Sequence, residues 1–325
     1  MAVVKCAIEL GIADVLESHQ AAMTLDELSS ALGCSPYSLF RIMRFLINRR
    51  IFKQVGGSDI NTIAYAQTPL SRLLTRNGEK SMAALVLLES TPVMLSPWHG
   101  LRERVLANGP PAFDTHRGQD IWTYAKNNPA HSKLINDAMA CDARFTVSAI
   151  MKGCPLVFEG IGTLVDVGGG DGTALRTLIK DCPWIRGINF DLPHVVSVAP
   201  HSHGVQHVGG NMFDSVPKAD SAFIMKVLHD WGDEECISIL KKCREAVPHD
   251  TGKVIIVEAV IDGGGHDSKL KDIALKIDMV MMAHTTTGKE RTSKEWTFVL
   301  NQAGFTRYTV NHIHAAVYSV IEAYP

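Results

Sequence analysis

Residues 163–173, TLVDVGGGDGT, constrain the fold of this chain more than any other stretch. A short apolar run leads to an acid, Asp166, and glycines follow at 168, 170 and 172. Glycine permits positive φ and lets a ligand approach the main-chain amides. A helix that begins beyond the glycines points its free N–H groups at the same place. The stretch therefore predicts a strand, a turn and a helix that together bind a cofactor containing adenosine.

The spacing of the glycines indicates which cofactor. The dinucleotide fingerprint G-x-G-x-x-G puts its third glycine one position later than it falls here. The pattern instead resembles the first motif of S-adenosylmethionine-dependent methyltransferases. Residues 187–190 predict the second strand, and Asp191 at its end suits the hydroxyls of a ribose. A dinucleotide site, and a glycine turn without cofactor preference, remain alternatives.

Composition excludes several classes of protein. The 325 residues suit two domains, and a net charge of -2 with both signs scattered creates no field for nucleic acid or an anionic membrane. No apolar run reaches the ~20 residues that a membrane-spanning helix needs, and residues 1–17 lack a signal-peptide pattern. The seven cysteines form no C-x-x-C pair, which indicates reduced thiols and a cytoplasmic location.

The first part of the chain is predicted to be helical, with one hairpin. Thr24 opens a capping box, and Ser35 followed by Pro36 starts a second helix. A hairpin is predicted within residues 51–67. This order of elements is that of a winged helix. Arg41 and Arg44 on the second helix leave DNA binding as an alternative.

From residue 160 onward, predicted strands and helices alternate, which favours a mostly parallel sheet with helices on both faces. Asp233 is predicted to cap a helix, and Thr292 to open another capping box. A long helix at about 267–283 is expected to turn Leu270, Ile273, Ile277, Val280 and Met281 inward. Ligands of such sheets bind at the carboxyl ends of the strands.

His229 follows the predicted fourth strand, and Glu258 lies inside the apolar run of the fifth. A buried acid needs a partner, and His229 is the nearest candidate. Methyl transfer from a sulfonium to a phenol is limited by the neutral phenol, whose pKa is about 10. A histidine of near-neutral pKa can remove that proton, and a carboxylate on its other nitrogen fixes the tautomer. A histidine with only a structural hydrogen bond is the alternative.

Five ordered motifs carry a family resemblance: LVDVGGGDGT, FDLPHV, GGNMFDSVP, VLHDWGDEE and GKER. They resemble the plant small-molecule O-methyltransferases, which methylate phenylpropanoids, flavonoids and phenolic alkaloids, and the resemblance covers nearly the whole chain. It implies an α/β fold in which a Rossmann-like methyltransferase sheet, with helices on both faces, follows a mainly helical, winged-helix-like dimerisation domain. The implied domains are 1–110 for dimerisation, 111–155 for helices that contribute to the substrate pocket, and 156–325 for S-adenosylmethionine binding and catalysis.

The resemblance also assigns residues, and it is the only reason to select Glu290. It implies a site in which His229 is the base and two acids orient it, Glu258 and Glu290. The sequence has no clustered set of Asp, Glu and Asn, which predicts that no metal takes part. The methyl donor, S-adenosyl-L-methionine, is expected to contact Gly168, Asp191, Asn211, Met212, Phe213 and Trp231. The acceptor pocket is expected to include Trp98, Met139, Asp142, Met281 and Thr285. For the two methionines, ordinary helix core is the alternative.

Three departures from the family pattern stand out. Asn211 replaces the usual aspartate and keeps an acceptor but loses the charge, which predicts weaker or altered donor binding. Met225 occupies the place of a family lysine, and Lys226, one step along a strand, is expected to point to the opposite face. The sequence also begins inside a segment that follows a further helix in the family, which leaves the strength of the dimer and full activity open.

The sequence therefore predicts a homodimer that transfers a methyl group from S-adenosylmethionine to a phenolic hydroxyl of a plant secondary metabolite, with a flavonoid favoured. No nucleic-acid or membrane partner is expected. Alternatives are a phenolic alkaloid or phenylpropanoid substrate, and an inactive homologue that serves as a dimer partner. A winged-helix regulator that senses the donor is the alternative from another class of protein.

Overall fold

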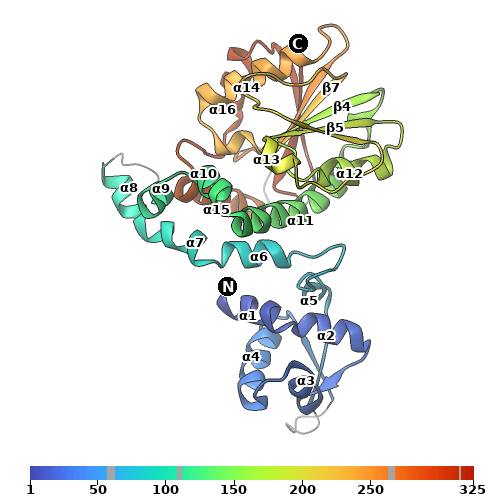
Figure 1. Ribbon diagram of the computed structural model, residues 1–325, viewed down its shortest axis with the longest axis vertical. Coiled ribbons are helices and arrows are strands. Elements are labelled where there is room, and N and C mark those ends of the chain that lie inside the picture. The colour runs from blue at the N-terminus through green and yellow to red at the C-terminus, as the bar shows by residue number, and fades with distance from the viewer. Residues whose placement is uncertain (57–62, 108–111, 263–267, 315) are drawn as a thin grey trace. The chain divides into compact units, whose positions relative to one another are not determined.

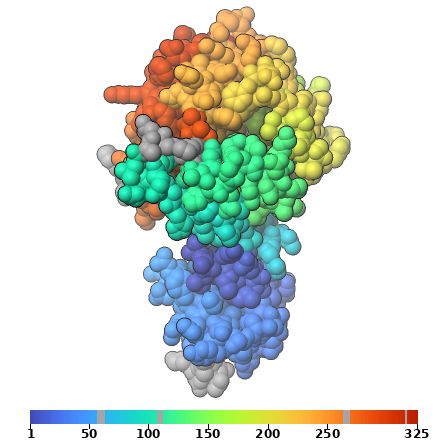
Figure 2. Space-filling model, turned by 60° about the vertical axis from the view of Figure 1, so that its left-hand side comes forward, coloured from blue at the N-terminus to red at the C-terminus, as the bar shows by residue number. Residues whose placement is uncertain are grey.

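The computed structural model describes residues 1–56, 63–107, 112–262, 268–314 and 316–325. The chain divides into two units, Met1–Leu95 with Lys133–Asp142, and Ser96–Ser132 with Ala143–Pro325. Figure 1 labels many of the helices and strands, and Figure 2 shows the molecular surface in the same colour order. One long helix, α11 (Pro129–Gly153), contributes residues to each unit. The predicted domain boundaries at 110 and 155 remain predictions.

The first unit is mainly helical and carries a small three-stranded sheet of order β1-β3-β2. Thr24 and Ser35 cap two of its helices as predicted, the first with a complete capping box. The helix–helix–hairpin order is present, while the winged-helix assignment itself remains a prediction. Its described elements are α1 (Ala2–Leu10), α2 (Ile12–His19), β1 (Met23–Thr24), α3 (Leu25–Leu32), α4 (Pro36–Asn48), β2 (Lys53–Gly56), β3 (Ile63–Ala66), α5 (Pro69–Arg72), α6 (Ala83–Glu89) and α7 (Pro92–Leu95).

The second unit is built on a seven-stranded sheet of order β6-β5-β4-β7-β8-β10-β9. Five neighbouring strands, β6 to β8 in this order, are parallel, and β10 is antiparallel to both of its neighbours, β8 and β9. The strands are β4 (Thr163–Val167), β5 (Arg186–Asp191), β6 (Val205–Gly209), β7 (Ser221–Met225), β8 (Lys253–Ala259), β9 (Arg307–His312) and β10 (Tyr318–Tyr324). The predicted Rossmann-like sheet with helices on both faces is thereby confirmed.

Helices cover both faces of this sheet (Figure 1). One hydrophobic core joins α14 and α16 to the sheet, and a second joins the later part of α11 and α12 to it. The described helical elements are η1 (Ser96–Gly100), α8 (Leu101–Ala107), α9 (Ala112–Arg117), α10 (Ile121–Asn127), η2 (Pro155–Phe158), α12 (Thr173–Asp181), α13 (Pro193–Val196), η3 (Leu228–Asp230), α14 (Asp233–Ala246), α15 (Ser268–His284) and α16 (Ser293–Gln302).

The strand order places the site. From β4 the chain adds β5 and β6 on one side, and it then returns to add β7 and β8 on the other. The carboxyl ends of β4 and β7 therefore lie at the point where the order reverses, which is where open α/β sheets bind ligands. The glycine-rich loop follows β4 and the HDW turn follows β7, so both lie at this point.

Two local predictions were wrong. Gly232 caps α14, and Asp233 is the first residue of that helix because its carboxylate binds Arg291 and Lys289 instead. Ile273 of α15 does not point inward, since 43% of its surface is exposed, whereas Ala274 and Met281 are buried. Across the described residues, no helix combines the length and hydropathy needed to cross a bilayer.

Candidate active site

The glycine-rich loop adopts backbone conformations that favour glycine. Gly168, Gly170 and Gly172 have φ values of 73°, 58° and 80°. A Cβ atom on Gly168 would lie 2.7 Å from a methyl carbon of Val227, so the loop packs closely on the chain that follows β7. The Gly170 N–H donates to Oδ2 of Asp191 over 2.8 Å. The predicted glycine corner and the predicted acid of the second strand thus form one hydrogen-bonded assembly.

The strand before the loop carries a buried carboxyl group near its end. Asp166 is 2% exposed, and burial, with Asp191 and Asp171 adding repulsion, raises its pKa to about 8. Burial also raises the pKa of Asp191, although the Gly170 and Leu192 N–H groups counteract this. At neutral pH, Asp166 is therefore mainly protonated.

Four predicted donor contacts lie on two loops, one after β6 and one after β7. Asn211, after β6, accepts a hydrogen bond at Oδ1 from the N–H of Phe213 over 3.1 Å. The rings of Phe213 and Trp231 meet edge to face, with centroids 4.9 Å apart. Met212 packs beside them against the core of the sheet. Asn211 thus shapes the turn in this structure, and its effect on donor binding remains a prediction.

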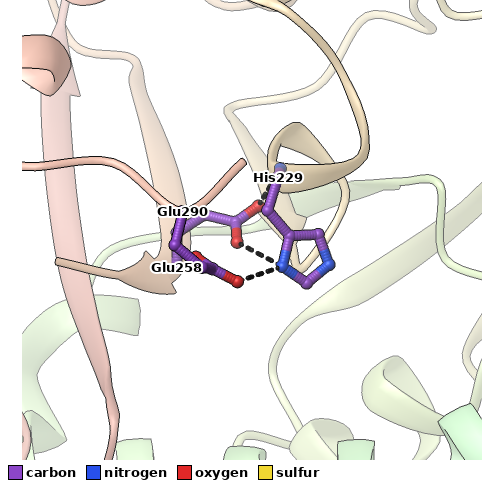
Figure 3. Close-up of side chains that lie close together, drawn as sticks. All are labelled: His229, Glu258 and Glu290. Atoms are coloured by element: carbon purple, nitrogen blue, oxygen red, sulfur yellow. Dashed lines mark hydrogen bonds and ion pairs between the residues drawn. The ribbon is translucent and has the colours of Figure 1, made fainter. Parts of the chain in front are cut away.

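His229 lies on η3, the short turn that follows β7. Its Nδ1 lies 2.7 Å from Oε1 of Glu290 and 3.6 Å from Oε2 of Glu258. Both glutamates approach the same nitrogen, and Nε2 lies on the side of the ring away from them (Figure 3). We assign the proton to Nδ1, because a carboxylate at 2.7 Å requires a donor there. Nε2 then carries the lone pair, with Oδ1 of Asp230 at 3.7 Å.

Glu258 contacts the backbone of the turn as well as the ring. Its Oε1 accepts from the N–H groups of Val227, Leu228 and His229 over 3.0, 2.8 and 3.4 Å. The residue is 0% exposed, which explains how an acid can stand within the apolar run of β8. The structure therefore brings together the three residues predicted as catalytic, with Glu290 alone at hydrogen-bond distance from the ring.

The acids change the proton affinity of this histidine. Burial alone lowers its pKa, but the negative charges of Glu258, Asp230 and Glu290 outweigh burial and raise the pKa of His229 to about 10. Burial has the opposite effect on the acids, because it disfavours their charged form: it raises the pKa of Glu258 to about 7 and that of Asp230 to about 6. The expected near-neutral imidazole was wrong, because more carboxyl groups converge on one buried ring than the sequence indicated.

The residues predicted for the acceptor pocket divide between the units. Trp98 meets His284 edge to face at 5.8 Å, close to Met281 and Thr285 at the end of α15. The Thr285 hydroxyl donates to the carbonyl of Met281 over 2.7 Å, so it also closes the helix. Met139 and Asp142 lie on the part of α11 that groups with the first unit, and Met139 is 43% exposed.

Lys226 differs from its prediction. β7 ends at Met225, so the alternation of strand side chains does not apply to the next residue. Lys226 has a φ of 54°, and its ammonium lies 5.3 Å from the ring centre of Tyr318. Burial lowers its pKa to about 7, which nearby Glu258 partly counteracts. Lys226 thus lies beyond the strand and near Tyr318 and Glu258, and its function remains a prediction.

Sequence reasoning missed Asp230 and Arg291. Asp230 lies near Nε2, and its position beside His229 in the HDW motif could have revealed it. Arg291 is 0% exposed and contacts the carbonyls of Leu228 and Trp231. Its neighbour Glu290 was the available signal, but the motif GKER alone indicates a solvated loop.

Comparison with known proteins decides the family. A model described as an O-methyltransferase domain matches residues 98–306, and one described as an O-methyltransferase dimerisation domain matches residues 1–77. The chain belongs to the O-methyltransferase family. The predicted activity class, an S-adenosylmethionine-dependent O-methyltransferase, is therefore confirmed.

Known relatives of this O-methyltransferase cover several substrates. It is 51% identical to an acetylserotonin O-methyltransferase of Arabidopsis thaliana, over 100% of this chain and 88% of the relative. It is 46% identical to flavonoid 4'-O-methyltransferase 4 of Mentha piperita, over 99% and 93%. The fold matches human N-acetylserotonin methyltransferase in complex with SAM, with a TM-score of 0.86 at 20% identity over 99% of this chain and 93% of that one.

Proposed function

We propose that this O-methyltransferase methylates a phenolic hydroxyl, with His229 as the general base. The observation that carries the proposal is the 2.7 Å contact between Nδ1 and Glu290. This contact fixes the ring, so that in the neutral imidazole the lone pair is on Nε2, which faces away from both glutamates (Figure 3). A buried imidazole held in one tautomer by a carboxylate is the arrangement of a general base.

Proton transfer is well matched to a phenol. A pKa of about 10 for His229 lies close to the pKa of a phenol, about 10, so neither side strongly holds the proton. As Nε2 takes the proton, Glu290 and Glu258 stabilise the imidazolium that forms. The phenolic oxygen becomes nucleophilic only as methyl transfer begins, which avoids a free phenolate in a buried site.

The residues at the carboxyl edge of the sheet suit S-adenosyl-L-methionine. We propose that Asp191 binds the ribose hydroxyls and that the loop around Gly168 approaches the donor closely, because its glycines leave room for a ligand. Phe213 and Trp231 offer apolar ring surface, and Met212 and Asn211 complete this set. When bound, the donor supplies an electrophilic methyl group.

We propose that no metal takes part. His229, Glu258 and Glu290 are the cluster of potential ligands within the described residues. Ligand atoms around a tetrahedral zinc ion are about 3.4 Å apart, since each bond is about 2.1 Å long. The 2.7 Å between Nδ1 and Glu290 is instead a hydrogen-bond distance. Turnover that survives EDTA would support this assignment, and turnover restored only by added metal would overturn it.

The substrate we favour is a flavonoid, with N-acetylserotonin as the second candidate. The second candidate rests on the 51% identity to an acetylserotonin O-methyltransferase. Other relatives carry flavonoid names at 43–46% identity, and one at 39% is named (RS)-norcoclaurine 6-O-methyltransferase. All three classes offer a hydroxyl on a flat aromatic ring, which Trp98, Met281 and Thr285 of the second unit suit. The roles of Met139 and Asp142 in substrate binding remain predictions.

We further propose a cytoplasmic homodimer. The match to a dimerisation domain supports the dimer, and Leu275 and Met279 on α15 support it too, because 43% and 40% of their surfaces are exposed. They lie four residues apart, on one face of the helix. Apolar side chains exposed together on a helix are suited to cover by another copy of the chain.

The test is a turnover assay with labelled donor against a panel of flavonoids, N-acetylserotonin and phenolic alkaloids, with His229→Ala beside the parent. We expect this variant to bind the donor as the parent does and to lose at least about two orders of magnitude in kcat, the usual contribution of a general base. Equal rates in the two proteins would refute the mechanism. Donor binding without turnover on any phenol would favour the inactive homologue.

A further inference from the structure

We infer that Arg291 is a positioning residue, which holds the turn that carries both His229 and Trp231. The inference rests on the proposed role of His229 and adds a second support to it. Glu258 binds the N–H groups at the start of this turn. Arg291 binds the carbonyl groups of the same turn. Both the N–H groups and the carbonyl groups of the turn are therefore bound by buried charged side chains.

The contacts of Arg291 are direct and fully enclosed. One guanidinium nitrogen, Nη1, donates to the carbonyl of Leu228 over 3.0 Å, and Nη2 donates to the carbonyl of Trp231 over 2.7 Å. The Nε–H donates to Oδ1 of Asp233 over 2.9 Å. The side chain is 0% exposed. These three partners bracket His229 in the sequence.

An arginine suits this place because of its geometry. Besides Arg291, the carbonyl of Leu228 accepts from the N–H of Trp231 over 3.3 Å, and the thiol of Cys236 lies 3.0 Å from that carbonyl and 3.5 Å from the carbonyl of Trp231. A thiol is a weak donor and 3.3 Å is a long hydrogen bond, so the guanidinium supplies the strong contacts to both carbonyls. The planar guanidinium has five N–H donors in a fixed arrangement, so one side chain can bind two carbonyls and a carboxylate together. A lysine carries the same charge on a single atom and cannot span this set.

Arg291 is itself held firmly. Its own carbonyl accepts from the N–H of Ile261 over 3.0 Å, which ties its backbone to the chain that follows β8. Its guanidinium lies 5.4 Å from the ring centre of Trp296, a fully buried side chain of α16. The guanidinium also binds Asp233, the first residue of α14. Arg291 therefore links the turn to the chain after β8, to α16 and to α14, so that these elements fix where the turn lies.

Two adjacent residues of GKER, Glu290 and Arg291, hold different parts of the turn. Glu290 binds the imidazole of His229, and Arg291 binds the backbone on either side of it. Trp231, whose ring contacts Phe213, is held through its carbonyl. Displacing Arg291 is therefore expected to disturb the base and the donor site together, whereas changing Glu290 disturbs the base alone.

The experiment compares Arg291→Lys with Glu290→Gln and a matched control, Arg307→Lys. Arg307 also packs over an aromatic ring, that of Tyr324 at 4.2 Å, but on β9. We expect Arg291→Lys to lower kcat at least about tenfold and to raise the donor KM severalfold, with the pH midpoint of activity unchanged. Glu290→Gln should lower kcat and move that midpoint with little change in donor KM. Arg307→Lys should behave as the parent.

Asp233→Asn provides a second variant in case Arg291→Lys folds poorly. It keeps the guanidinium but weakens its anchor, so a smaller change in the same two constants is expected. Unchanged kcat and donor KM in folded Arg291→Lys, with only a lower melting temperature, would overturn the inference. The proposed function fails separately, through an active His229→Ala variant, so the two failures are distinguishable.

Discussion

At the scale of single residues, the environment of His229 determines the pH range in which the enzyme is active. An imidazole acts as a base only when Nε2 is unprotonated. Acids around the ring raise the pKa of His229 to about 10, so the unprotonated fraction grows as the pH rises towards that value. The charge that steadies the imidazolium during reaction therefore also keeps the resting base protonated at neutral pH.

The expected consequence is a rate that climbs with pH. We predict that kcat rises with a slope of about one in log units between about pH 7 and 9, and levels near 10. Glu290→Gln removes one acid, so the pKa of His229 falls and the rising limb moves to lower pH, while the plateau rate also falls. A stopped assay across this range, with substrate at saturation, measures both effects.

Lys276→Ala, a change on the exposed surface of α15, serves as the control and should leave the pH curve in place. A rising limb that stays fixed in Glu290→Gln would mean that the phenol itself, and not His229, is what titrates.

At the scale of structural elements, the unit of β4, glycine loop and α12 was predictable because its determinants are local. The sequence shows the glycines that adopt positive φ and the acid at the end of β5. Capping boxes at Thr24 and Thr292 were predictable for the same reason. Each signal lies within a few residues of the structure it specifies.

Other features depend on residues far apart in the chain. Asp233 does not cap α14, because Arg291, 58 residues later, recruits its carboxylate. Glu290 lies 61 residues from His229, and nothing near it in the sequence indicates that contact. The pKa of the histidine depends in turn on Glu258 and Asp230 together. These properties arise from the folded arrangement, so local patterns could not predict them.

The strand that leads into the glycine loop yields a prediction about charge. With a pKa of about 8, Asp166 is mainly protonated at pH 7, and an amide has nearly the same shape. We predict that Asp166→Asn changes donor affinity less than about threefold at pH 7, whereas Asp191→Asn weakens it more than about tenfold. Titration calorimetry with the donor gives both values.

The same measurement at about pH 9.5 extends this test. Above its pKa the parent Asp166 becomes ionised, so the parent and Asp166→Asn should then differ. If Asp166→Asn loses as much affinity as Asp191→Asn at pH 7, the carboxyl is charged there and the argument from burial is wrong.

At the scale of the whole molecule, the chain combines a dimerisation unit with a catalytic unit. Family models match residues 1–77 and 98–306 separately. The order of these parts could be predicted from the motifs of the sequence. The exposed position of Ile273 could not, because the 3.6-residue period predicts an apolar face without saying what will cover it.

We predict that the protein elutes as a dimer, with about twice the mass of the 35.5 kDa chain. Met279→Glu, combined with Leu275→Glu, should shift the population towards monomer, because a charge buried in an apolar interface lacks a partner. Light scattering after size exclusion measures the mass. Lys241→Glu, on the exposed surface of α14, is the control, and a dimer unaffected by the double change would exclude this face.

The three backbone hydrogen bonds of Glu258 have a consequence for redesign. That carboxylate is tied to the shape of the main chain, so an engineer who alters it changes the loop along with the chemistry. The side chain of Glu290 instead forms a hydrogen bond with the imidazole of His229. Mutagenesis aimed at substrates with more acidic or less acidic hydroxyls should therefore begin at Glu290. A change there alters the basicity of His229 and leaves the backbone hydrogen bonds of the turn in place.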